Sequence, residues 1–95
     1  MKMLKQSEYP TELKIGDEEY RVAFVASIDG TNTIGLCDSG NKVIHIQKGL
    51  SKEETLQTFI HEVIHSMEFE YNIKISHRSV YKFETAIYNF IKDNF

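Results

Sequence analysis

Glycine and proline stop at residue 49, and this boundary constrains the fold more than any other feature of the 95-residue chain. All five glycines and the one proline lie in the first half, where they mark turns. The second half contains neither residue and carries apolar residues at helical spacing. The sequence therefore predicts an α+β fold in one domain spanning residues 1–95, with strands before residue 50 and helices after it.

Alternating side chains predict the strands of the first half. Tyr20, Val22 and Phe24 share one face of the segment Glu19–Val25. Turn residues at 16–17, 29–32 and 38–41 separate this segment from shorter extended runs at 12–15, 33–37 and 42–47. We expect a small antiparallel sheet of three to four strands.

Two amphipathic helices are predicted in the second half. Ser51 and Glu54 form a capping-box pattern that starts the first helix, which should run to about Tyr71. Ser76 is the expected N-cap of the second helix. The apolar stripes expected to be buried are Leu56, Phe59, Ile60, Val63, Ile64 and Met67 in the first helix, and Val80, Phe83, Ile87, Phe90 and Ile91 in the second. We expect the sheet to pack on this two-helix hairpin.

Charge and cysteine content narrow the functional classes. The net charge of −3 and the scattered Lys and Arg residues argue against a nucleic-acid partner. No apolar run approaches the ~20 residues of a membrane span, which argues against a membrane partner. The single cysteine, Cys37, excludes an intramolecular disulfide and a multi-cysteine zinc site. We expect a cytoplasmic protein.

The first predicted helix contains the sequence His61-Glu62-Val63-Ile64-His65. Residues four apart lie on one face of a helix, so both imidazoles can point at one metal ion. Glu62 lies ~100° around the helix from His61, beside the ion without binding it. That position suits the general base for a metal-bound water, and the pattern favours a zinc site.

Two residues compete for the role of third ligand, because catalytic zinc takes three protein ligands and a water. Returning ~12 Å along a helical hairpin from residue 63 places Glu84 near the ion. An extended 72–76 loop would run back ~16 Å and bring His77 there instead. Glu84 also interrupts an apolar helix face, where a carboxylate needs a partner.

Three segments carry a resemblance to a known family: the run from His61 to Tyr71, Ile75-Ser76-His77, and the run from Val80 to Glu84. Together with Gly35-Leu36-Cys37-Asp38 and the strand Val43–Gln47, they resemble the small zincin metallopeptidases common in phage and prophage genomes.

The resemblance implies a ligand set. In those small proteins the position matching His77 is His or Glu, and Spartan-like zincins take their third histidine from the start of the next helix. Minimal gluzincins use a glutamate inside that helix, which corresponds to Glu84. We therefore favour His77 as third ligand, with Glu84 as the alternative; if His77 binds zinc, Glu84 orients a ligand histidine. The metzincin subclass is excluded, because no glycine and third histidine follow His65 at short spacing.

The leading hypothesis is a zinc-dependent peptidase. His61, His65 and His77 would hold zinc and its bound water, and Glu62 would take a proton as this water attacks a peptide carbonyl. The partner would be a peptide or protein substrate, paired along a sheet edge formed by residues 42–47.

The alternative is a non-catalytic zinc-binding module that acts in structure or interaction. Its mark would be a fourth protein ligand from Cys37, His45 or Glu84. The simpler expectations are a half-exposed strand residue for His45 and a buried structural thiol for Cys37. Tyrosines are weaker candidates as oxyanion donors: Tyr71, Tyr81 and Tyr88.

Overall fold

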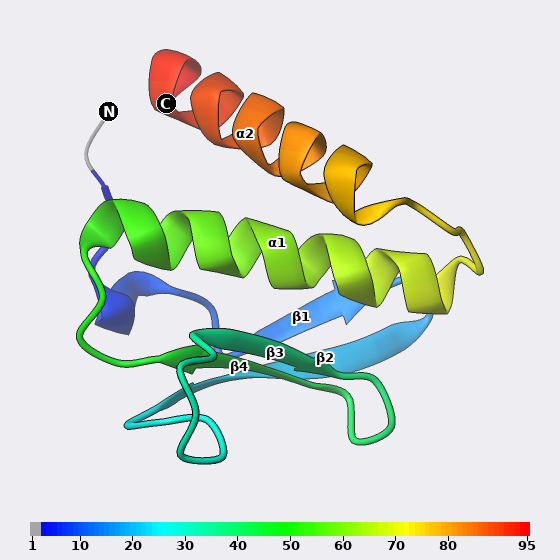
Figure 1. The fold of residues 1–95 in the computed structure, drawn as a ribbon, viewed down its shortest axis with the longest axis horizontal. Helices are drawn as coiled ribbons and strands as arrows, with labels where there is room; N and C mark the ends of the chain where they lie inside the picture. Colours follow the sequence, from blue (N-terminus) through cyan, green and yellow to red (C-terminus); the bar gives the residue numbers. More distant parts are fainter. Residues whose placement is uncertain (1–2) are drawn as a thin grey trace.

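The computed structural model describes residues 3–95 and has four strands followed by two long helices (Figure 1). In chain order the elements are a 3₁₀ turn η1 (Gln6–Glu8), the strands β1 (Glu12–Ile15), β2 (Glu18–Val25), β3 (Gly35–Asp38) and β4 (Val43–Gln47), and the helices α1 (Lys52–Glu70) and α2 (His77–Asn94). The predicted α+β class and two-helix hairpin are confirmed. No helix within residues 3–95 has the length and apolar character needed to cross a membrane.

The sheet is mixed rather than fully antiparallel, with the order β1-β2-β4-β3. Pairs β1–β2 and β3–β4 are antiparallel, as expected, whereas β2 and β4 are parallel, with Val22 opposite Ile44. Each strand reverses the direction of the one before it, so β2 and β4 point the same way. The loop of residues 26–34 carries the chain past the place of β4 to the edge, and β4 then returns between β2 and β3.

This order corrects the predicted substrate edge. The segment of residues 42–47 contains β4, which is paired on both sides and offers no free backbone edge. The edge on this side of the sheet is β3. Sequence alternation identifies a strand but does not say which neighbours it pairs with, so the interior position of β4 was not predictable from its own residues.

Helix α1 forms the middle layer, between the sheet and α2 (Figure 1). Phe59 and Val63 pack against the buried cluster of the sheet, whereas Ile60 and Ile64 are buried against α2. The predicted single stripe is therefore two rows on two sides of one helix. Met67 belongs to neither row and is 44% exposed, so its predicted burial is wrong.

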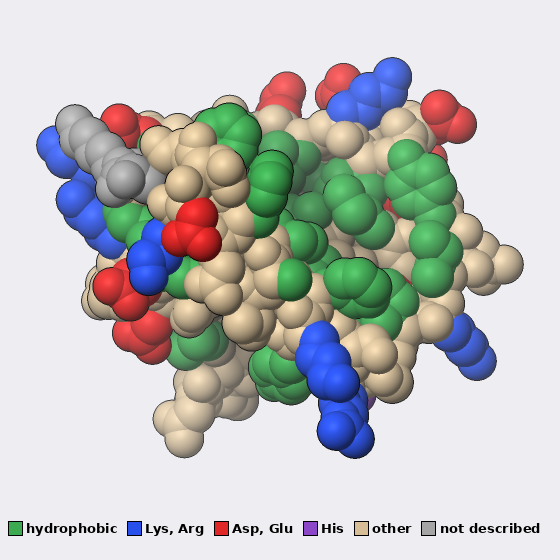
Figure 2. All heavy atoms as spheres, turned by 90° about the horizontal axis from the view of Figure 1, so that it is seen from above, with side chains coloured by type: hydrophobic (Ala, Val, Ile, Leu, Met, Phe, Trp, Pro, Cys, Tyr) green, Lys and Arg blue, Asp and Glu red, His purple; other side chains and the backbone are tan. Residues whose placement is uncertain are grey.

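Helix α2 is an outer layer that buries only one side. Val80 and Tyr88 are buried, and Ile91 packs against the same cluster. The other half of the predicted stripe faces out, because the hairpin has no further layer above it; these side chains are Phe83, Ile87 and Phe90. Figure 2, which views this side of the molecule, shows hydrophobic side chains gathered on the surface.

Local signals explain where the helices begin and end. The Ser51 side chain accepts a hydrogen bond from the Glu54 N–H at 3.1 Å, which is the predicted cap of α1. At the other end, Asn72 takes a left-handed conformation with φ 54°, and the Ile73 N–H donates to the Glu68 carbonyl. This is a Schellman-type stop, so the chain leaves α1 sharply and Ser76 caps α2 four residues later.

Candidate metal centre

Helical geometry brings His61 and His65 together near the middle of α1. Their Nε2 atoms are 3.1 Å apart, and the ring centroids are separated by 4.7 Å. Two nitrogens bound to one tetrahedral zinc at 2.0–2.1 Å would lie about 3.3 Å apart. The two Nε2 atoms therefore have nearly the separation that a shared ion requires.

Each of these histidines has a carboxylate on its other ring nitrogen. Glu84 Oε1 lies 2.7 Å from His61 Nδ1, and Glu68 Oε1 lies 2.7 Å from His65 Nδ1. A carboxylate accepts the Nδ1–H proton, so in the neutral tautomer both Nε2 atoms carry a lone pair. Two lone pairs facing each other at 3.1 Å need a proton or a cation between them. Carboxylates behind ligand histidines are also usual in zinc sites.

Glu68 is a functional candidate that the sequence analysis missed. Its Oε1 contacts His65, and its Oε2 accepts the backbone N–H of Ile75 at 3.0 Å. One side chain thus joins the helix that carries His65 to the loop that leads into α2. The available signal was its position three residues after His65, on the same helix face.

Glu62 points away from α2 and toward the sheet edge. It is only 7% exposed, and burial raises the pKa of its carboxyl group, with a smaller rise from the charge of Glu84. The charge of His65, which outweighs that of Glu84, and a backbone hydrogen bond from Cys37 in β3 both lower this pKa. A buried glutamate with a raised pKa is a stronger base than an exposed one, which suits a general base.

Gly35 lets β3 approach α1 at this point. A Cβ atom on Gly35 would lie 2.5 Å from Thr58 Cγ2 and 2.9 Å from Glu62 Oε2, both closer than real contacts allow. Only glycine fits here without a shift of the neighbours. The absence of a side chain on this strand residue therefore positions the sheet edge directly beside Glu62.

The structure places the two candidates for third ligand differently. His77 is the first residue of α2, and its ring centroid lies 6.0 Å from that of His65. Glu84 contacts the Nδ1 side of His61, opposite the converging Nε2 atoms. No group of three or more His, Cys, Asp or Glu side chains within residues 3–95 meets in a metal-binding arrangement. The choice between His77 and Glu84 stays a prediction.

The other donors considered for a closed site lie elsewhere. His45 is half-buried, as expected, and with Leu36 and Asp29 it lines a small hollow away from the histidine pair. Cys37 packs against the sheet core, its Sγ lies 3.6 Å from Ser39 Oγ, and burial raises the pKa of its thiol. Neither side chain contacts His61 or His65 within the described chain.

The three candidate tyrosines differ in their distance from the histidine pair. Tyr81 lies beside the site, with its ring centroid 5.2 Å from that of His61. Tyr88 is buried between the helices, and Tyr71 is exposed at the end of α1. Of the three tyrosines considered, Tyr81 is the one next to the histidine pair.

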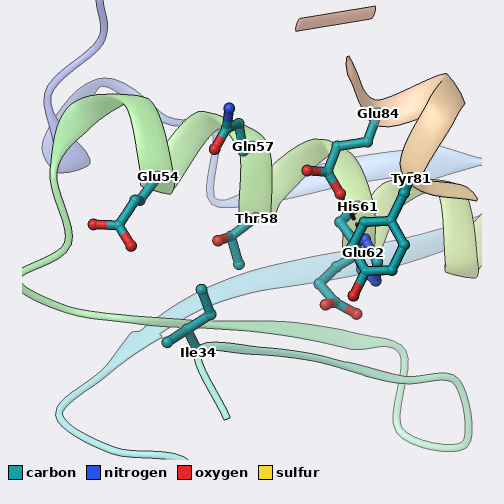
Figure 3. Close-up of a pocket in the computed structure, with 8 residues that line it drawn as sticks. All are labelled: Ile34, Glu54, Gln57, Thr58, His61, Glu62, Tyr81 and Glu84. Atoms are coloured by element: carbon teal, nitrogen blue, oxygen red, sulfur yellow. Dashed lines mark hydrogen bonds and ion pairs between the residues drawn. The ribbon is translucent and has the colours of Figure 1, made fainter. Parts of the chain in front are cut away.

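A pocket of about 220 Å³ opens beside His61 and Glu62 (Figure 3). Its walls come from α1, from the first turns of α2 and from the residue before β3; they are Ile34, Glu54, Gln57, Thr58, His61, Glu62, Tyr81 and Glu84. Both the proposed base and one proposed ligand therefore face space that a substrate can enter.

Comparison with known protein families, curated proteins and solved structures finds no match for this chain.

Proposed function

We propose that this protein is a zinc-dependent peptidase in which His61 and His65 supply two zinc ligands. The observation that carries the proposal is the facing pair of Nε2 atoms, 3.1 Å apart, with a carboxylate on each Nδ1. A shared proton would also satisfy the pair, but two imidazoles, each supported by a carboxylate, are a donor set typical of zinc sites. His77 is proposed as third ligand, with Glu84 as the alternative.

Zinc bound here would act as a Lewis acid that polarises a peptide carbonyl and lowers the pKa of a water. Glu62 accepts a proton from the attacking water and delivers it to the nitrogen of the leaving amine. Its burial supports this role, since a raised pKa makes the carboxylate a stronger base than an exposed glutamate.

The β3 edge is the proposed binding place for the substrate backbone. The Gln47 N–H donates to the Ile34 carbonyl, so by strand alternation the N–H and C=O of Gly35 face the open edge. An extended peptide can pair with these groups and lie beside Glu62. The partner is thus a peptide or protein; the lone cysteine favours the cytoplasm as the compartment.

Glu62→Gln separates catalysis from metal binding. Zinc content by mass spectrometry and hydrolysis of a fluorogenic peptide library should be measured on wild type, Glu62→Gln and the exposed control Glu53→Gln. We expect one zinc per chain in all three and hydrolysis reduced at least ~10³-fold in Glu62→Gln alone. Zinc in all three without hydrolysis in wild type would favour the non-catalytic module.

The third ligand is tested by zinc affinity. His77→Ala should weaken zinc binding by more than ~10³-fold, as loss of a direct ligand, and Glu84→Gln by only 10- to 100-fold, as loss of an orienting carboxylate. The reverse order would assign Glu84 as the ligand.

A further inference from the structure

The pocket next to Glu62 extends well beyond the residues assigned to chemistry. Glu54, Gln57 and Thr58 continue along α1 toward its N-terminus (Figure 3). Glu54 precedes Glu62 by eight residues, which is ~12 Å along the helix axis. A substrate side chain must therefore be long to reach from the reacting bond to Glu54.

Unpaired polar groups line this extension. The residue Thr58 is only 7% exposed, and its hydroxyl makes no hydrogen bond within residues 3–95. The hydroxyl oxygen is accessible to the pocket, because no fully buried side-chain nitrogen or oxygen of the described residues lacks a partner. The methyl of Thr58 faces Gly35, which leaves the hydroxyl on another side of the residue. The Gln57 amide also makes no hydrogen bond within the described chain. An accessible hydroxyl without a partner, on a largely buried residue of the pocket wall, is available to a ligand with a complementary polar group.

The negative charge of the pocket walls favours a ligand with a positively charged group. Three carboxylates line the pocket, from Glu54, Glu62 and Glu84, and no lysine or arginine of the described chain does so. Glu84 is paired with His61, and Glu62 accepts a backbone hydrogen bond. Glu54 has only a long 3.3 Å contact with the Ser51 hydroxyl and is exposed, so its carboxylate is the one free to pair with a substrate.

The opposite wall suits the stem of such a side chain. Ile34 faces α1 with an apolar surface, and Tyr81 adds an aromatic ring at the end of the pocket beside Glu62 (Figure 3). A lysine or arginine can place its methylene groups against these residues while its charged end reaches Glu54 and the Thr58 hydroxyl. A short or acidic side chain makes neither contact.

We propose that this pocket binds the side chain of a lysine or arginine next to the cleaved bond of the substrate. The inference rests on the proposed peptidase function, which fixes the place of the cleaved bond beside Glu62. Glu54 is then the residue that determines specificity, and the substrates are peptides with basic residues.

Binding can be tested without catalysis. Nα-acetyl-lysine methylamide and its norleucine counterpart are titrated into the purified protein and followed by amide NMR shifts. We expect the lysine probe to shift pocket residues at millimolar concentration, and its affinity to fall about 5-fold in Glu54→Gln but not in Glu53→Gln. Glutamine keeps the capping box, so Glu54→Gln should fold normally. Equal binding of both probes to wild type would overturn the proposal.

Hydrolysis distinguishes the two levels of inference. Two sets of peptides, which differ only at the residue before or only at the residue after the cleaved bond, carry Arg, Lys, norleucine or Glu there and are compared in wild type and Glu54→Lys. In one of the two sets, we expect at least ~10-fold faster cleavage of the Arg and Lys peptides by wild type, and a preference for Glu in Glu54→Lys. Cleavage that depends on Glu62 but is equal for all four peptides in both sets would overturn the specificity alone. No cleavage of any peptide would overturn both.

Discussion

The two helices differ in how firmly the fold holds them. Helix α1 is buried on two sides, by the sheet and by α2, whereas α2 packs mainly on α1 and leaves Phe83 and Phe90 in solvent. The facing pair His61 and His65 belongs to the firmly held helix, and His77 belongs to the first turn of the other. Two of the three proposed ligands are therefore placed by the more deeply buried helix, whereas the position of the third, His77, depends on how α2 packs on α1.

The largest effect should come from the buried row between the helices. Ile60→Ala removes a side chain that is 5% exposed, so it should lower the free energy of unfolding by about 3 kcal/mol. Phe83→Ala removes a larger side chain that is 53% exposed, and should cost less than about 1 kcal/mol. Urea unfolding measures both. Equal losses would mean that the outer side of α2 is covered in solution.

The next effect concerns the contact between α1 and the sheet edge. Gly35→Ala adds a Cβ that meets Thr58 and Glu62, so we expect a loss of about 2 kcal/mol in stability and slower peptide hydrolysis. Gly40→Ala is the matched control, because its Cβ meets only Asp38 Oδ1 at an ordinary 3.5 Å. A Gly35→Ala protein as stable and active as the control would show that β3 does not need this close approach.

A substitution of Glu68 tests whether its contacts with His65 and Ile75 support the proposed metal site. Glu68→Gln should weaken zinc binding about 10-fold, because an amide supports the Nδ1–H of His65 less well than a carboxylate. It should also speed hydrogen exchange of the Ile75 N–H, which Glu68 Oε2 accepts. Exchange and zinc affinity both unchanged from wild type would remove Glu68 from the account.

The smallest effect is a pH dependence of the free energy of unfolding, which comes from the contacts that Glu70 of α1 makes with Lys42 and Tyr20. Lys42, at 2.5 Å, and the Tyr20 hydroxyl hold the pKa of Glu70 below its ordinary value. This contribution to stability is therefore present above the ordinary carboxyl pKa of about 4.3 and is lost as the pH falls through the lower folded-state pKa. Glu70→Gln should flatten this part of the stability profile, measured by urea unfolding from pH 7 to pH 3. An identical acid-side slope in both proteins would contradict it.

Signals between residues close in sequence were sufficient to predict the helices, the strands and the facing pair of histidines. The Ser51 cap, the alternation around Tyr20 and the spacing of His61 and His65 each depend on neighbours in sequence, and each predicted the observed local structure. The sequence also predicted that the two amphipathic helices, α1 and α2, form a hairpin.

Features that depend on distant neighbours were not predicted. The interior place of β4, the exposure of Met67 and the close approach at Gly35 follow from which elements pack together. Glu68 was missed because its second contact, with Ile75, forms only when the chain turns between the helices. Periodicity identifies an apolar face but does not tell how many layers cover it.

The central claim is that His61 and His65 share a metal ion. The most direct test is zinc per chain, by mass spectrometry after zinc incubation and gel filtration, for wild type, His65→Ala and the control His45→Ala. We predict one zinc in wild type and in His45→Ala, and a near-complete loss in His65→Ala. Wild type without zinc, or His65→Ala with as much zinc as wild type, would contradict the account.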